Sequence, residues 1–150
     1  MKKLFTLFLL LSICAFVFAQ DVEKDKDAIK NLILTAYVDG LQNNGDLDAT
    51  REGFHPGFEL LVFKNDMVSK FPIYNWIIYE EMGQAKNPDP LPKEEITSCE
   101  FEFIDITGTA AVAKIHLSKA GEKIYTDYLS LYKFVDGWKI VSKIYFQIPE

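Results

Sequence analysis

One acidic side chain interrupts an otherwise apolar row near the end of the chain. Within the predicted strand at 125–131, alternate residues share one face, and they are Tyr125, Asp127, Leu129 and Leu131. A carboxylate on an apolar wall can act as a general base near neutral pH, because desolvation disfavours its charged form. Asp127 is therefore the candidate acid–base residue, although the sequence pairs no second catalytic group with it.

The polar residues around Asp127 follow from the expected strand register. Two-residue hairpin turns are predicted at Thr107-Gly108, Ala120-Gly121 and Asp136-Gly137. This register places Lys114 opposite Asp127, with His116, Tyr125 and Cys99 close by. An apolar cavity with a few convergent polar groups is the usual form of a small-molecule site.

Two alternatives weaken this interpretation. Lys114 and Asp127 can instead form an ordinary cross-strand ion pair, worth less than about 1 kcal/mol if exposed. A three-residue loop with a bulge at Gly137 would shift the last strand, placing Lys139 and Lys143 on the face of Asp127.

The same register sorts the strand residues into two faces. The expected core face comprises Cys99, Phe101, Phe103, Asp105, Val112, Lys114, His116, Tyr125, Asp127, Leu129, Leu131, Trp138, Ile140, Ser142, Ile144 and Phe146. On the other face, Tyr128, Tyr132, Val141 and Tyr145 form an amphipathic patch, and aromatic residues are enriched at protein interfaces. We therefore expect a homodimer through this patch, the alternative being a solvated face with large residues.

The two histidines lack the spacing of metal ligands, so no metal site is predicted. His55, before Pro56, either lines the mouth of a pocket or bonds the nearby backbone. His116 either joins the pocket or faces solvent near a turn. The sequence has no phosphate loop, serine-nucleophile elbow or dinucleotide fingerprint, and no cofactor is predicted.

Helical segments are expected first along the chain. Apolar residues recur at helical spacing after Asp25 and Asp27, at Ile29, Leu32, Ile33, Ala36, Tyr37 and Leu41. A short second helix should begin at Asp46 or Asp48 and stop at His55-Pro56.

Strands dominate the remainder of the chain. A strand at 58–63 should turn at 64–66 and return at 67–70. Pro72 suits the start of a third helix that Gly83 closes. Four antiparallel strands then fill 99–149, which gives an α+β fold with helices covering one face of a curved sheet.

The first 19 residues predict a secretory signal peptide. Lys2 and Lys3 precede an apolar run at 4–18 that is too short to span a bilayer comfortably, and Ala19 marks a cleavage site before Gln20. Residues 20–150 then form a single domain, periplasmic or secreted, with no membrane span after cleavage.

Charge and cysteine content narrow the partners. Removing the signal peptide changes the net charge from −6 to −8, which disfavours binding to nucleic acid and to anionic membranes. Only Cys99 survives cleavage, so no intramolecular disulfide is predicted.

Several segments together resemble a known family. They are Ala28-Ile29, Tyr37-Val38-Asp39-Gly40-Leu41, Gly45-Asp46, Phe54-His55-Pro56, Asp127-Tyr128-Leu129-Ser130-Leu131 and Trp138-Lys139-Ile140-Val141-Ser142-Lys143. This pattern resembles the putative lumazine-binding family of the NTF2-like superfamily, which also holds the SnoaL-like polyketide cyclases. The resemblance covers nearly all of the chain after the signal peptide.

The resemblance implies a cone, with the sheet wrapped around the first helix and a pocket at the open end. Enzymes of this fold use an acid–base carboxylate or histidine, which on this chain would be Asp127, His55 or His116, with Tyr37 or Tyr74 as hydrogen-bond donors. The superfamily includes isomerases, dehydratases, hydrolases and transport factors, so the resemblance specifies a fold and not a reaction.

Three functions remain open. The first is an exported domain that binds a small, largely apolar or aromatic molecule in the cone. Its expected lining residues are Tyr37, His55, Trp76, Phe101, His116, Tyr125, Asp127 and Phe146. The second is a cofactor-free isomerase, dehydratase or cyclase that uses Asp127 or a histidine. The third is an interaction module that docks through the tyrosine-rich face.

Overall fold

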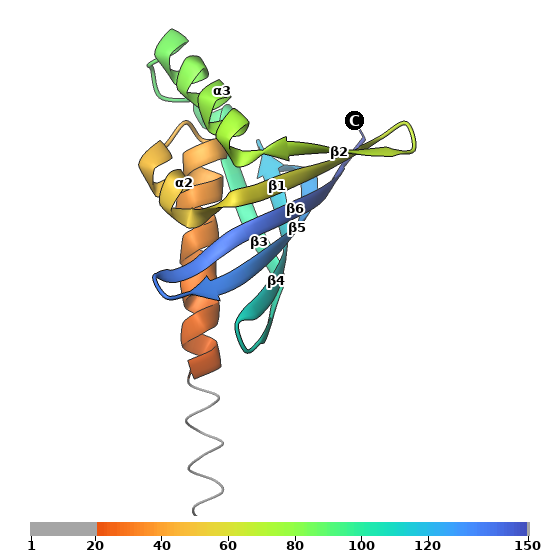
Figure 1. Cartoon of the computed structure of the whole chain (residues 1–150). Helices are drawn as coiled ribbons and strands as arrows, with labels where there is room; N and C mark the ends of the chain where they lie inside the picture. The colour runs from red at the N-terminus through yellow and green to blue at the C-terminus, as the bar shows by residue number, and fades with distance from the viewer. Residues whose placement is uncertain (1–20, 150) are drawn as a thin grey trace, which may run out of the picture.

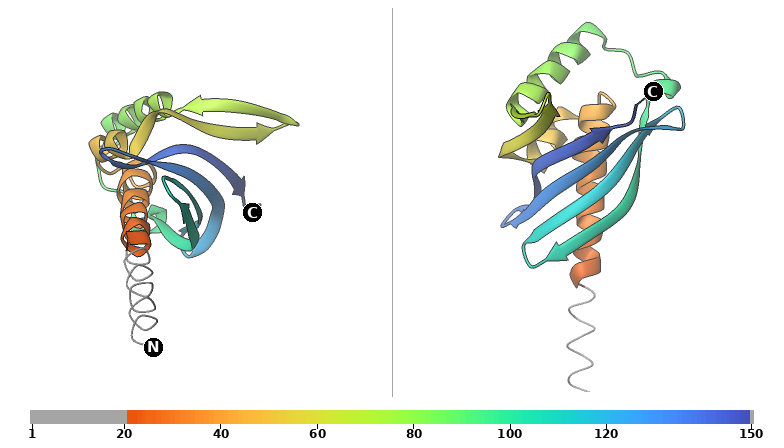
Figure 2. Two further views of the ribbon diagram at one scale, coloured as in Figure 1. Left: turned by 60° about the horizontal axis from the view of Figure 1, so that its bottom comes forward. Right: turned by 90° about the vertical axis from the view of Figure 1, so that its right-hand side faces the viewer.

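A computed structural model describes residues 21–149, and the predicted signal peptide lies outside the described residues. A helix packs across the hollow of a curved six-stranded sheet, and further helices gather at one end (Figures 1 and 2). The α+β cone expected from the sequence is confirmed. Within residues 21–149, no helix combines the length and apolar character that a bilayer span requires.

The first helix changes type along its length. It is α-helical over 21–32 and continues as a π-helix, η1, over Ile33–Gln42. π-Helical segments are rare and frequently lie at functional sites. The residues expected on its buried stripe are buried, except Leu32, which is half-buried. The helix ends where Asn44 takes a positive φ and the Gly45 N–H bonds the Asp39 carbonyl.

The second helix, α2 (Leu47–Gly53), packs tightly on the first. Asp46 caps it by accepting a hydrogen bond from the Asp48 N–H at 2.8 Å. A Cβ at Gly53 would lie 2.3 Å from the Ala36 Cβ, so glycine alone permits this approach. α3 (Ile73–Lys86) begins after Pro72 as expected but runs through Gly83, so its predicted end is wrong by three residues.

A six-stranded mixed sheet forms most of the remaining structure. Its strands are β1 (Phe54–Lys64), β2 (Met67–Pro72), β3 (Thr97–Thr107), β4 (Ala110–Lys119), β5 (Glu122–Phe134) and β6 (Gly137–Gln147), in the order β2-β1-β6-β5-β4-β3. A short 3₁₀ turn, η2 (Lys93–Glu95), precedes β3. β1 lies parallel to β6, and all other neighbours are antiparallel.

The predicted register of β3 and β4 is wrong. Thr107 pairs with Ala110, so the turn is Gly108-Thr109 and the pairing near it shifts by two residues, which leaves the faces unchanged. The face that β4 presents is nevertheless the opposite of the expected one, because an unpaired residue in β5, Ile124, changes the alternation between β4 and β5. Alternate residues of β4, namely Ala111, Ala113, Ile115 and Leu117, are buried. Val112, Lys114 and His116 consequently lie on the outer face.

Three β-bulges produce the remaining differences. Register shifts leave Glu102, Ile124 and Val141 without a partner in β3, β5 and β6. Each extra residue reverses which side chains face the core beyond it. Asp127 therefore pairs with Ile115 and not with Lys114, whose partner is Tyr128.

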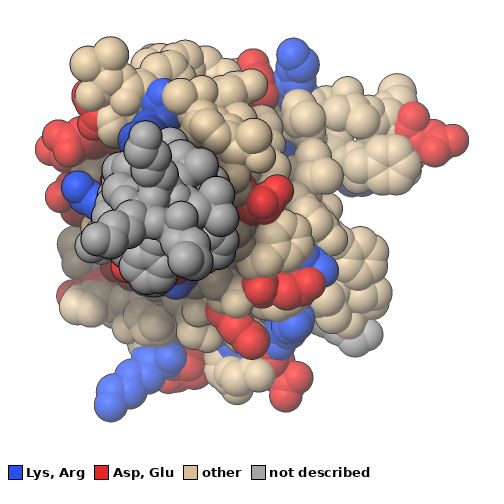
Figure 3. Space-filling model, turned by 90° about the horizontal axis from the view of Figure 1, so that it is seen from below, with Lys and Arg blue, Asp and Glu red and all other residues tan. Residues whose placement is uncertain are grey.

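The β1–β2 hairpin extends away from the body of the domain (Figures 1 and 2). Phe63, Met67 and Val68 near its tip are exposed. In Figure 3 acidic and basic side chains are interspersed over the body, and the projecting hairpin is mainly uncharged.

Candidate functional site

Three polar side chains from distant parts of the chain meet inside the cone. The Tyr37 hydroxyl donates to Asp127 Oδ2 at 2.6 Å, and Lys143 Nζ lies 2.7 Å from the same oxygen. Lys143 also donates to the Tyr37 hydroxyl. We call Tyr37, Asp127 and Lys143 the buried triad.

Local irregularities bring the triad together. Tyr37 projects from the π-helical segment η1, and Asp127 faces inward from β5. The bulge at Val141 turns Lys143 and Tyr145 inward, opposite Leu129 and Asp127 respectively. Without that extra residue Lys143 would point to the outer face.

The surroundings of the triad are buried and aromatic. Lys143 Nζ lies 4.6 Å from the ring centroid of Tyr37, 5.3 Å from that of Tyr145 and 5.6 Å from that of Trp76. Burial lowers the pKa of Lys143, while the charge and hydrogen bond of Asp127 oppose that shift. Burial, followed by the Asp127 charge, raises the pKa of Tyr37 well above its usual range.

One oxygen of the triad has no partner. Asp127 Oδ1 is buried and makes no hydrogen bond. Buried polar atoms are almost always satisfied, and an orphaned carboxylate oxygen is a candidate proton acceptor. Burial and the Asp127 charge raise the pKa of the nearby Cys99 thiol to about 12, which disfavours a thiolate there.

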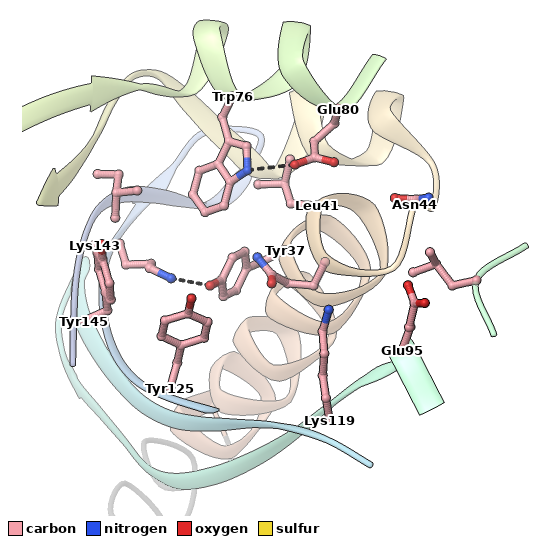
Figure 4. Close-up of a pocket in the computed structure, with 13 residues that line it drawn as sticks. Tyr37, Leu41, Asn44, Trp76, Glu80, Glu95, Lys119, Tyr125, Lys143 and Tyr145 are labelled. Carbon is pink, nitrogen blue, oxygen red and sulfur yellow. Dashed lines mark hydrogen bonds between the residues drawn. The ribbon is translucent and has the colours of Figure 1, made fainter. Parts of the chain in front are cut away.

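A pocket of about 420 Å³ opens above the triad (Figure 4). Its lining residues are Tyr37, Leu41, Gln42, Asn44, Leu60, Trp76, Glu80, Leu91, Glu95, Lys119, Tyr125, Lys143 and Tyr145. Trp76 Nε1 donates to Glu80 Oε1 at 3.1 Å, and burial raises the pKa of Glu80. Figure 4 shows the Tyr125 hydroxyl and the Lys143 amine directed toward Tyr37, with Lys119 and Glu95 on the opposite side.

The structure brings four of the predicted site residues to this region. Tyr37, Trp76 and Tyr125 line the pocket. Asp127 lies beneath it and is fully buried, so it reaches the pocket through Tyr37 and Lys143.

The other predicted lining residues lie elsewhere. His55 stacks on Phe134 with ring centroids 5.0 Å apart, and its Nδ1 accepts from the Gly57 N–H at 3.0 Å. His116 is on the outer face, with Nε2 2.9 Å from Glu102 and Nδ1 3.0 Å from Thr126. Neither histidine therefore lines the pocket: His55 bonds the nearby backbone, and His116 faces outward instead of lying beside Asp127.

Three further aromatic residues also fall outside the pocket: Phe101, Phe146 and Tyr74, the last of which was expected as a hydrogen-bond donor. Phe101 packs against the core, and Phe146 is exposed because the Val141 bulge turns it outward. Tyr74 is 70% exposed on α3.

The same bulge divides the patch expected to form a dimer. Tyr128 and Tyr132 are exposed on the outer face, whereas Tyr145 lines the pocket. The four residues of the patch therefore do not share one surface. Dimerisation itself stays a prediction.

Lys143 is the main residue that the expected register misses. The alternative with a bulge at Gly137 places it on the face of Asp127, but the bulge lies at Val141, and Lys139 instead donates to the Glu52 carbonyl. Among residues 21–149, no three His, Cys, Asp or Glu side chains gather as a metal site would require.

Comparisons with known proteins agree with this architecture. A curated relative, the aldolase FrzH of Cladobotryum sp, is 28% identical over 121 residues, covering 79% of this chain and 90% of that protein. An NTF2-like protein of unknown function from Shewanella baltica OS155 is 26% identical with a TM-score of 0.65, covering 85% of this chain and 96% of that one. Another, from Silicibacter pomeroyi DSS-3, is 18% identical with a TM-score of 0.66, covering 85% and 98%.

The family profile described as putative lumazine-binding matches residues 24–146. The chain therefore belongs to the putative lumazine-binding family and has the NTF2-like cone fold.

Proposed function

We propose that the cone binds a small molecule through a carbonyl or carboxylate oxygen held by Lys143. The observation that carries this proposal is a lysine amine at the base of a pocket of about 420 Å³. Small-molecule sites of this size combine apolar walls with a few placed polar groups.

The lining suits an amphipathic ligand and not a purely apolar one. Leu41, Leu60 and Trp76 supply apolar contact area. Lys143 and Tyr125 supply donors at the base, and a charge-assisted hydrogen bond is worth about 1.5–3 kcal/mol. An acceptor oxygen on the ligand is the group that these donors recognise.

Catalysis on a carbonyl compound is the second candidate. Two observations favour it: the unpartnered Oδ1 of Asp127 beside Lys143, and the relative named an aldolase. An ammonium and a tyrosine hydroxyl near a carbonyl oxygen stabilise the enolate that forms when a proton leaves the adjacent carbon. Both histidines lie outside the pocket, so the buried triad is the better acid–base set.

Fluorescence titration tests the binding proposal. Three aromatic probes carry a ketone, a carboxylate and no polar group, respectively: benzylacetone, phenylacetate and butylbenzene. We expect benzylacetone and phenylacetate to quench Trp76 more strongly than butylbenzene does, and a Trp76→Phe variant identifies the reporter.

Lysine variants define the role of the amine. We expect Lys143→Met to weaken binding of the two oxygen-bearing probes about tenfold, or about 1.4 kcal/mol. Lys114→Met, on the outer face, is the matched control and should leave the affinity unchanged. If each probe bound Lys143→Met as tightly as it binds wild type, the proposed role of Lys143 would be refuted.

Export and self-association form a separate part of the proposal. The run of apolar residues after Lys2 and Lys3 supports cleavage before Gln20. N-terminal sequencing of the protein from its host should give Gln20 first. Exposed Tyr128 and Tyr132 support a dimer, which Tyr128→Glu should dissociate in sedimentation analysis.

A further inference from the structure

We propose that Lys143 forms a Schiff base with an aldehyde or ketone bound in the pocket. This inference rests on the proposed function and narrows it, since it selects a carbonyl carbon over a carboxylate as the group that Lys143 meets. Lysine amines act as nucleophiles on carbonyl substrates when burial favours their neutral form.

The position of the amine supports this role. Lys143 is 5% exposed but lines the pocket, so its amine faces both the protein interior and the ligand space. Figure 4 shows its amine reaching toward Tyr37 inside the pocket. A lysine in a purely structural ion pair needs no opening to a cavity.

The groups facing the amine come from four elements. They are Tyr37 on η1, Trp76 on α3, Tyr125 and Asp127 on β5, and Tyr145 on β6. Asp127 is the one carboxylate in contact with Lys143 among the described residues. Burial lowers the pKa of Lys143, which makes the neutral amine more accessible than on an exposed lysine.

Asp127 is placed to move the protons of this step. The Lys143 ammonium gives one proton to the Asp127 carboxylate, and the freed lone pair forms the N–C bond as the C=O π bond breaks. The oxygen then gains two protons, both originally on nitrogen and returned through Asp127 and the neighbouring tyrosine hydroxyl. The C–O bond breaks, water leaves, and a protonated imine remains on Lys143. Asp127 ends as it began.

The protonated imine would activate the bound molecule for a further reaction. A protonated imine withdraws electrons from the adjacent carbon, so a bond from that carbon to hydrogen or to another carbon becomes easier to break. Asp127 exchanges protons with the reacting nitrogen of Lys143 and, being fully buried, does not contact the ligand itself.

Reductive trapping tests the proposal on the intact wild-type protein. The protein is incubated with benzaldehyde or benzylacetone and cyanoborohydride across about pH 6–9, and the adduct is mapped by peptide mass spectrometry. We expect one adduct, with the mass of the carbonyl compound less one oxygen, on Lys143. Its formation should persist at lower pH than labelling of the exposed lysines, with at least a tenfold preference at neutral pH.

Variants and binding data separate the outcomes. Lys143→Arg keeps the charge but should lose the adduct, and Lys114→Arg should keep it; circular dichroism confirms that both fold. Probe binding without a Lys143 adduct, or labelling of Lys119 in its place, overturns the Schiff base but leaves the binding function intact. Absence of both binding and adduct for every probe overturns the proposed function and this inference together.

Discussion

Two lysine–carboxylate pairs lie on opposite faces of the same sheet. Lys143 and Asp127 meet inside the cone at 2.7 Å, and Lys114 and Glu102 meet on the outer face at 2.8 Å. The inner side chains are 6% and 0% exposed, and the outer ones 21% and 43%. The nitrogen–oxygen distances of the two pairs are almost identical, whereas their exposure to solvent differs.

The environment reverses the response of the lysine. Burial lowers the pKa of Lys143, whereas the Glu102 hydrogen bond raises the pKa of Lys114. Desolvation therefore outweighs the ion pair inside the cone, and the ion pair outweighs desolvation outside it. Deprotonation is therefore easier for the lysine of the inner pair than for the lysine of the outer pair.

Breaking the inner pair should have the largest effect. Asp127→Asn leaves the buried Lys143 without its counter-charge, and we expect a loss of about 3–5 kcal/mol in the free energy of unfolding, measured by urea denaturation. Replacing both partners, as Asp127→Leu with Lys143→Met, should recover most of that loss. A single variant as stable as wild type would remove the contrast between the two faces.

An intermediate effect is expected at the pair of Asp25, which is half-buried, and Lys133, which is exposed. Lys133 Nζ lies 2.7 Å from Asp25 Oδ1, and Trp138 Nε1 donates to the same oxygen at 3.1 Å, tying the first helix to the β5–β6 hairpin. Asp25→Asn should cost about 0.5–1 kcal/mol at neutral pH and low salt.

The pH dependence of that cost follows from the carboxyl group. The Lys133 hydrogen bond lowers the pKa of Asp25 below its ordinary value of 3.8. Its stabilisation is therefore complete above pH 3.8 and is lost as the pH falls through the lowered value. Wild type and Asp25→Asn should converge in strong acid, and a constant difference would assign the effect to packing.

The smallest effect is expected on the outer face. Glu102→Gln removes the partner of Lys114 and of His116, but water reaches these side chains. We expect no measurable change in the urea midpoint or in probe binding. A loss comparable to that of Asp127→Asn would show that burial does not distinguish the two pairs.

The helices and the fold class could be predicted from sequence because each rests on a repeated pattern. The buried stripe from Ile29 to Leu41 and the Ala120-Gly121 turn, with both residues at positive φ, are as expected. The faces of β4 and the end of β6 could not be predicted, because a bulge adds one residue and leaves no periodic signal.

The residues of the candidate site could be predicted where no bulge intervenes and could not be predicted where one does. Tyr37 and Trp76 lie on helices, and Tyr125 shares a face with Leu129 and Leu131 by uninterrupted alternation along β5, so these three line the pocket as expected. Lys143 and Phe146 follow the bulge at Val141, which exchanges their faces. The residue that matters most for the proposed chemistry, Lys143, thus faces inward only because of a bulge, which the sequence offered as an alternative but at the wrong position.

The parallel pairing of β1 with β6 sets the order in which the protein can be completed. β1 ends at Lys64, yet the strand beside it, β6, spans Gly137–Gln147 and follows all the other described strands. The sheet cannot close until β6 has been synthesised, and such long-range pairings form slowly. Lys143 lies on that final strand, so we expect its amine to remain in water through most of folding. The pocket and its buried lysine would then be assembled together, in the last step.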